Sequence, residues 1–172
     1  YKGLWAPGFK KPNLPVLITK PTSLIRIDHI VGNVELGKMD EWGEFYNNIF
    51  GFFTFVRFDD TDISTKYSSL KSIVLRSKNW KIKLPINEPA EGLKKSQIDE
   101  YLEFNEGPGV QHLAILSDDI ISSIKVLREN GVDFLDVPDT YYDNLESRIG
   151  VIDEDMDKLK KLNILVDRDD NG

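Results

Sequence analysis

Residues 24–31 read Leu-Ile-Arg-Ile-Asp-His-Ile-Val, and residues 110–116 read Val-Gln-His-Leu-Ala-Ile-Leu. Both stretches alternate apolar residues in the manner of a half-buried strand. Each contains one of the two histidines of the chain, His29 in the first and His112 in the second. The period of two directs both imidazoles to the apolar face of their strands. Two strands of this kind predict an internal repeat.

The segments around the two strands support the repeat. After the first strand, the pattern predicts a helix over 38–50 and then strands over 52–58, 68–76 and 80–87, a βαβββ unit. After the second strand it predicts a helix over 119–130, and Gly-Val-Asp-Phe-Leu at 131–135 matches Gly-Phe-Phe-Thr-Phe at 51–55. We therefore expect an α+β fold of paired βαβββ modules that curl into a half-open barrel. The first module is predicted over 24–105 and the second over 106–172.

Composition excludes several classes of protein and site. The chain has 172 residues, of which 40% are hydrophobic and 30% charged, which indicates a globular protein. No apolar run is long enough to span a bilayer. A net charge of −7, with scattered basic residues, disfavours nucleic acid and anionic membranes as partners. The absence of cysteine leaves histidine and carboxylates as metal ligands, and a reducing cytoplasm is the expected location.

The two ends of the sequence predict a fragment of a longer protein. The chain starts at Tyr1 without an initiator methionine, and its proline-rich residues 1–23 resemble an interdomain linker. Residues 163–167 have the pattern of a strand that runs toward Asn171 and Gly172, a dipeptide typical of a hairpin turn. No returning strand follows in the sequence. We expect the second module to lack its C-terminal strands.

The histidine pair is the candidate metal site. A single imidazole on an apolar face is more often a core residue than a ligand. Two imidazoles at equivalent positions of a repeat favour a metal held between the modules. Two histidines and one carboxylate would form a facial triad, which leaves positions open for a 2-oxo acid and dioxygen. Asp28 is predicted to face away from His29, so the sequence offers no evident carboxylate for the third position.

Several motifs together resemble one enzyme family. They are IDHIVGN at 27–33, LPINEP at 84–89, KSQI at 95–98, GPGVQHLA at 107–114, VP at 137–138, TYY at 140–142 and ILVDRD at 164–169. In this order and spacing they resemble the 4-hydroxyphenylpyruvate dioxygenase family over nearly the whole chain. The resemblance implies a vicinal oxygen chelate fold, of the glyoxalase and dihydroxybiphenyl dioxygenase kind. It also implies His29 and His112 as ligands of Fe(II).

The resemblance carries further expectations about the site. It implies that the third iron ligand is a glutamate beyond Gly172, so that the fragment alone binds iron weakly and turns over poorly. It implies that Ser72, Asn87 and Gln97 line the pocket for 4-hydroxyphenylpyruvate. From the residues alone, Ser72 could be a small sheet residue, Asn87 a turn cap and Gln97 a solvated helix residue. We leave Gln111 out of the site because an ideal strand directs its side chain away from that of His112.

Two other functions remain open. The expected reaction converts 4-hydroxyphenylpyruvate and dioxygen to homogentisate and CO2, a step of tyrosine catabolism. 4-Hydroxymandelate synthase uses the same substrate and iron but hydroxylates the benzylic carbon. A non-catalytic binding protein of the same fold is the third possibility, because fold alone does not fix function. We expect a homo-oligomer for the full-length protein.

Overall fold

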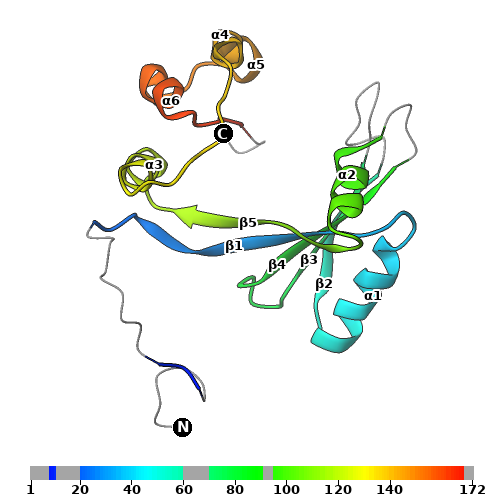
Figure 1. Ribbon diagram of the computed structural model, residues 1–172. Coiled ribbons are helices and arrows are strands. Elements are labelled where there is room, and N and C mark those ends of the chain that lie inside the picture. The colour runs from blue at the N-terminus through cyan, green and yellow to red at the C-terminus, as the bar shows by residue number, and fades with distance from the viewer. Residues whose placement is uncertain (1–7, 11–19, 60–69, 91–94, 169–172) are drawn as a thin grey trace. The chain divides into compact units, whose positions relative to one another are not determined.

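The computed structural model describes residues 8–10, 20–59, 70–90 and 95–168. Its contacts divide the chain into two compact units, Ile25–Leu116 and a second that joins Tyr1–Leu24 to Ser117–Gly172. Each unit has a hydrophobic core of its own. The predicted α+β class is confirmed, with a five-stranded sheet and several helices (Figure 1).

The sheet contains the predicted βαβββ module. The module consists of β1 (Leu24–Asn33), α1 (Met39–Phe50), β2 (Phe53–Phe58), β3 (Leu70–Arg76) and β4 (Lys83–Pro89), and it is followed by α2 (Gln97–Phe104) and β5 (Gly109–Ser117). The strand order is β2-β3-β4-β1-β5. Strand β3 pairs antiparallel with β2 and β4, and β1 pairs parallel with β4. The first strands of the two repeats, β1 and β5, are therefore neighbours.

Helix α1 covers one face of this sheet (Figure 1). The core beneath it contains Ile73 and Leu75 of β3 and Ile86 of β4, all almost fully buried. The N-cap residue of the helix, Lys38, forms no capping hydrogen bond through its side chain. The helix begins at Met39, whose backbone N–H donates to the buried carboxylate of Glu88 at 3.1 Å. A strand residue distant in sequence thus satisfies the helix N-terminus, which local patterns cannot reveal.

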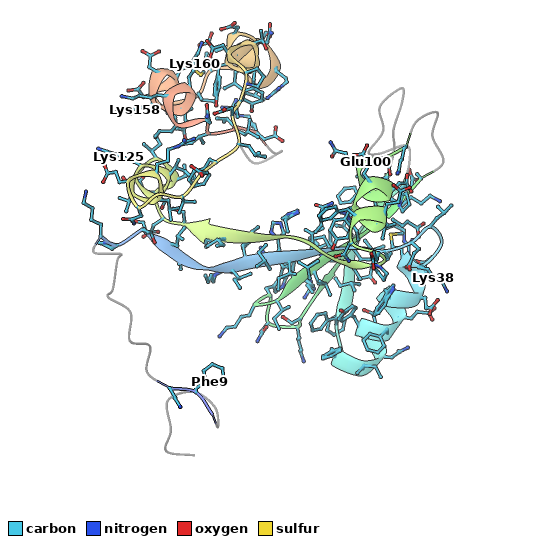
Figure 2. The ribbon with its side chains drawn as sticks, in the orientation of Figure 1. Phe9, Lys38, Glu100, Lys125, Lys158 and Lys160 are labelled. Atoms are coloured by element: carbon cyan, nitrogen blue, oxygen red, sulfur yellow. The ribbon has the colours of Figure 1, made fainter. Side chains whose placement is uncertain are left out.

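The other unit is built from short helices. They are α3 (Ile120–Glu129), α4 (Asp139–Asp143), α5 (Leu145–Ile149) and α6 (Met156–Leu162). Their core is formed by Tyr142, Leu145, Leu159 and Ile164. The cap of α6 is Asp155, whose carboxylate accepts from two backbone N–H groups. The two lysines of α6 that Figure 2 labels form ion pairs, Lys158 with Asp155 at the start of the same helix and Lys160 with Asp139 of α4.

Residues 163–167 do not form the predicted strand. The carbonyls of Ile164 and Val166 and the N–H of Val166 bond to tyrosine side chains, and the N–H groups of Asn163 and Ile164 bond to carbonyls of α6. The Tyr141 hydroxyl donates to the carbonyl of Val166 at 2.7 Å and accepts from its N–H, and the Tyr142 hydroxyl donates to the carbonyl of Ile164. The predicted turn at 171–172 lies outside the described residues. Within those residues, β5 and α3 are the elements of the second repeat that correspond to β1 and α1. No helix in the described part of the chain is long and apolar enough to cross a bilayer.

Candidate metal centre

The structure brings the two predicted histidines together on adjacent strands. The ring centres of His29 and His112 lie 5.7 Å apart, with an angle of 75° between the ring planes. A metal–imidazole bond is about 2.1 Å long, and the ring centre lies about 1.1 Å behind the nitrogen, so two rings on one cation have centres at most about 6.4 Å apart. The observed separation falls within this limit. The two imidazoles therefore stand close enough to share one cation.

Nδ1 of His29 is held by the preceding residue. The carboxylate of Asp28 lies 3.0 Å from this nitrogen, and Nζ of Lys83 donates to both carboxylate oxygens at 2.7 Å. The hydrogen bond from Lys83, followed by that from His29, lowers the pKa of Asp28 from 3.8 to about 2. Asp28 is therefore a carboxylate at neutral pH. A carboxylate on Nδ1 fixes the ring and leaves Nε2 for a ligand.

Nδ1 of His112 has a similar partner, the preceding residue on β5. Oε1 of Gln111 lies 2.7 Å from this nitrogen, and Nε2 of the same amide donates to Oδ1 of Asn33 at 3.1 Å. In both repeats the residue before the histidine thus contacts Nδ1. Metal-binding histidines commonly bond through their second ring nitrogen to such an acceptor.

The sequence-based prediction for Asp28 and Gln111 was wrong in this respect. The alternation rule gives the direction of each Cβ and correctly separates these residues from the histidines. It does not describe how far the polar end of a side chain reaches. Both side chains return to the ring of the next residue, so both belong to the site. Their type, an acceptor directly before a histidine in both repeats, was the signal that could have found them.

Other ligands of a cation are not assembled in the described part of the chain. There, no third histidine or acidic side chain joins His29 and His112 in a group that could hold a metal. The two imidazoles suit iron and other transition metals, and the sequence has no thiolate to compete. The residues present therefore fit such an ion as a partial site with two of its ligands.

Two of the three predicted substrate residues face each other across the sheet. Ser72 of β3 is paired with Asn87 of β4, and Asn87 is paired with Asn33 of β1. Cross-strand partners share a face, so these three side chains form a polar row. His29 lies four residues before Asn33 on β1, which places it on the same face by the period of two. The row and the histidine pair therefore occupy one face of the sheet.

Gln97 is the third predicted substrate residue. It is the first residue of α2, and its side chain is exposed. The helix begins there because Ser96 forms a capping box with Asp99. The substrate role of Gln97 remains a prediction.

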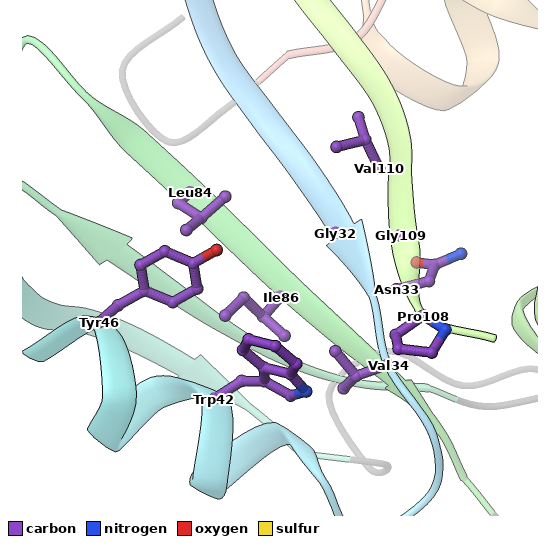
Figure 3. Close-up of a pocket in the computed structure, with 10 residues that line it drawn as sticks. All are labelled: Gly32, Asn33, Val34, Trp42, Tyr46, Leu84, Ile86, Pro108, Gly109 and Val110. Atoms are coloured by element: carbon purple, nitrogen blue, oxygen red, sulfur yellow. The ribbon is translucent and has the colours of Figure 1, made fainter.

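A cavity of about 190 Å³ lies elsewhere in the same unit. Figure 3 shows it between Trp42 and Tyr46 of α1 and residues of β4, β1 and β5. Neither His29 nor His112 lines it. Its wall is mainly apolar and contains no histidine or carboxylate, so we do not place the reaction there.

Comparison with known proteins agrees with this arrangement. The chain is 44% identical over 180 residues to the 4-hydroxyphenylpyruvate dioxygenase of Neurospora crassa, an alignment that covers 100% of this chain and 44% of that protein. It is 47% identical over 179 residues to the enzyme of the same name from Dictyostelium discoideum, covering 100% of this chain and 49% of that protein. The chain thus spans about half the length of the relatives it matches.

A solved structure has a similar fold. A variant of 4-hydroxymandelate synthase from Streptomyces coelicolor superposes with a TM-score of 0.72 at 32% identity, covering 84% of this chain and 40% of that one. The family described as the Glyoxalase/Bleomycin resistance protein/Dioxygenase superfamily matches residues 26–160, which include both histidines. This confirms the predicted vicinal oxygen chelate fold. The chain belongs to the Glyoxalase/Bleomycin resistance protein/Dioxygenase superfamily.

Proposed function

We propose that this chain is the histidine-bearing part of an Fe(II)-dependent 4-hydroxyphenylpyruvate dioxygenase. In the proposed reaction, 4-hydroxyphenylpyruvate and dioxygen give homogentisate and CO2. The observation that carries the proposal is the close approach of His29 and His112, each with Nδ1 occupied and Nε2 left for a cation. The identity to dioxygenases of this name along the whole chain supports it.

The iron ligands in this proposal are His29, His112 and a glutamate beyond Gly172. Bound Fe(II) would activate dioxygen and attract the carboxylate and keto oxygens of the substrate. The role of the chain is to hold and orient the two imidazoles. Asp28 and Gln111 do so through Nδ1, and Lys83 keeps Asp28 charged and in place.

The substrate in this proposal lies along the polar row on the same face. The hydroxyl of Ser72 and the amide of Asn87 supply hydrogen bonds to its polar groups, and Gln97 contributes from α2. Ser72 is only 6% exposed, so its hydroxyl sits in a largely desolvated position. A hydrogen bond there discriminates strongly against a ligand that lacks the matching group. Homo-oligomerisation and a cytoplasmic location remain predictions.

4-Hydroxymandelate synthase is the second candidate function. The observation in its favour is the similarity to the Streptomyces coelicolor structure. Both activities need the same two histidines, so the histidine pair does not separate them. The identity to that structure is 32%, against 44–47% to the two dioxygenases, which favours the dioxygenase.

The test is to identify the product formed with Fe(II), 4-hydroxyphenylpyruvate and dioxygen. We would compare this chain with a longer version that carries the segment after Gly172. The longer protein is expected to form homogentisate, with one CO2 released per dioxygen consumed. The two candidate products have the same composition, so chromatography against both standards must separate them. Formation of 4-hydroxymandelate would reject the dioxygenase in favour of the synthase.

Matched variants connect the activity to the site. His29→Ala and His112→Ala in the longer protein are expected to abolish product formation. Lys125→Ala on α3, in the other unit, serves as the control and is expected to retain it. If the longer protein forms neither product while it remains folded and loaded with iron, the enzymatic proposal fails and a binding protein of the same fold is favoured.

A further inference from the structure

Asn33 is a fully buried amide at the end of β1. Its exposed fraction is 0%, and its backbone is in register with that of Asn87. Figure 3 shows its side chain beside Pro108 and Gly109, at the start of β5. Oδ1 of Asn33 accepts a hydrogen bond from Nε2 of Gln111. Asn33 is buried in a paired strand, whereas Gln111 is exposed. The end of the Asn33 amide that contacts Gln111 is Oδ1, while Nδ2 is buried without a hydrogen-bond partner among the described residues.

This hydrogen bond determines which end of the Gln111 amide faces His112. Oδ1 of Asn33 can only accept, so the NH₂ group of Gln111 must face it. The other end of the amide, Oε1, then faces Nδ1 of His112 at 2.7 Å. Because Oε1 can also only accept, the proton of the neutral imidazole must lie on Nδ1. Nε2 keeps its lone pair.

We propose that Asn33 is a positioning residue that sets the tautomer of His112 through Gln111. The importance of this tautomer for metal binding rests on the proposed function, whereas the tautomer itself does not. With both amides turned around, Gln111 would donate to Nδ1 and the imidazole proton would lie on Nε2. A ring in that form cannot bind a cation through Nε2.

The other histidine shows why such a residue is needed only once. Asp28 presents a carboxylate to His29, and both of its oxygens are acceptors, so no rotation of the group changes its role. The amide of Gln111 has an acceptor end and a donor end. An external acceptor must select between them, and Asn33 Oδ1 is the group that contacts the donor end.

The test measures the tautomer in the metal-free chain by nitrogen NMR of its two imidazoles. The spectra are recorded at about pH 9, well above the pKa of a free imidazole side chain. The chain has only two histidines, so His29→Ala assigns both. The parent chain is expected to hold His112 mainly as the Nδ1–H form. Asn33→Leu and Gln111→Met are each expected to shift His112 toward the Nε2–H form favoured by free imidazole side chains, with His29 unchanged.

Conservative variants separate this role from general structural damage. Asn33→Asp retains the acceptor and is expected to retain the Nδ1–H form. Gln111→Glu replaces the amide with a carboxylate, which has two acceptor oxygens and no donor end. In that background, Asn33→Leu is expected to leave the tautomer of His112 unchanged. If the leucine variant does not fold, Asn33→Ala replaces it, and the dispersion of the backbone resonances reports folding.

Titration with Fe(II) alone distinguishes this inference from the proposed function. Asn33→Leu is expected to weaken Fe(II) binding by about tenfold or more. A parent chain with His112 in the Nε2–H form, or a folded Asn33 variant without a tautomer shift, would overturn the inference even if iron binds. A tautomer shift in this chain, together with a failure of the longer protein that carries the segment after Gly172 to bind iron, would leave the inference standing and reject the proposed function.

Discussion

Oδ2 of Asp28 lies 3.0 Å from Nδ1 of His29, the next residue on the same strand. The side chains of neighbouring strand residues point to opposite faces, so this contact requires the carboxylate to turn back toward the ring. Lys83 on β4 holds it there with two hydrogen bonds of 2.7 Å. Lys83, Asp28 and His29 thus form a chain that orients one of the proposed metal ligands.

Replacement of Asp28 should weaken metal binding at His29. Asp28→Ala removes the acceptor on Nδ1, and loss of such a partner typically lowers metal affinity by about 10-fold to 100-fold. Asp28→Asn should have a smaller effect because one oxygen acceptor remains. Calorimetric titration with Fe(II) under exclusion of oxygen measures both. Arg26→Ala is the control, since Arg26 contacts the same carboxylate only at 3.4 Å, and equal affinity of the Asp28→Ala variant and the parent would contradict the role of Asp28.

Gly43 in α1 should not tolerate a larger residue beside Ile73. A Cβ at Gly43 would lie 2.7 Å from Cδ1 of Ile73, which is 1% exposed. Gly43→Ala gains about 1 kcal/mol of helix propensity, but overpacking typically costs about 1–3 kcal/mol. We expect a net loss of stability in urea unfolding. Ile73→Val removes Cδ1, so Gly43→Ala should stabilise the protein in that background, and additive effects of the two substitutions would refute the clash.

Tyr142 should make the helical unit sensitive to alkaline pH. Burial, followed by the charges of Tyr141 and Asp139, raises the pKa of its hydroxyl. The unfolded chain therefore loses the Tyr142 proton near pH 10, at a lower pH than the folded chain does. The contribution of Tyr142 to the free energy of unfolding is complete below about pH 10 and is lost as the pH rises further. Tyr142→Phe should remove this decline and cost about 1 kcal/mol at neutral pH, because the Ile164 carbonyl loses its donor.

The control for this experiment is Tyr101→Phe. Its hydroxyl also donates to a backbone carbonyl, that of Val110, but in the unit that contains the sheet. Urea unfolding at a series of pH values from about 8 to 11 compares the variants. An alkaline loss of stability that is the same in Tyr142→Phe and in the parent would contradict the assignment.

The capping box of α2 should contribute measurably to stability. The Ser96 side chain accepts from the backbone N–H of Asp99, and the Asp99 carboxylate accepts from that of Ser96. Ser96→Ala removes the first of these bonds and should cost about 1 kcal/mol in urea unfolding. Ser147→Ala, at an exposed hydroxyl of α5, is the matched control with a smaller expected cost. Equal decreases in the free energy of unfolding for the two variants would show that the capping hydrogen bond does not stabilise α2.

The sequence predicted the strands and the helix between residues 24 and 89, and the proximity of the two histidines, for physical reasons. Strands with a clear period of two and a helix with apolar spacing have local signals, and β1–β4 and α1 lie close to their predicted ranges. The repeat placed His29 and His112 at matching points of adjacent strands, which the structure confirms as neighbours.

What the sequence could not show depends on contacts between distant residues. Residues 163–167 have a strand pattern, but their carbonyls bond to the hydroxyls of Tyr141 and Tyr142. The start of α1 is set by Glu88, far away in the sequence. Asp28 and Gln111 were rejected because alternation describes the backbone direction and not the reach of a polar side chain.

Whether one cation is shared by His29 and His112 is tested most directly by following both imidazole rings during a titration with Fe(II). Paramagnetic Fe(II) broadens the NMR signals of nearby nuclei. The account predicts that both rings lose their signals together over the same range of Fe(II) concentration, and that His29→Ala greatly weakens the response of His112. Independent responses of the two rings, with His112 unaffected by His29→Ala, would contradict a shared metal centre.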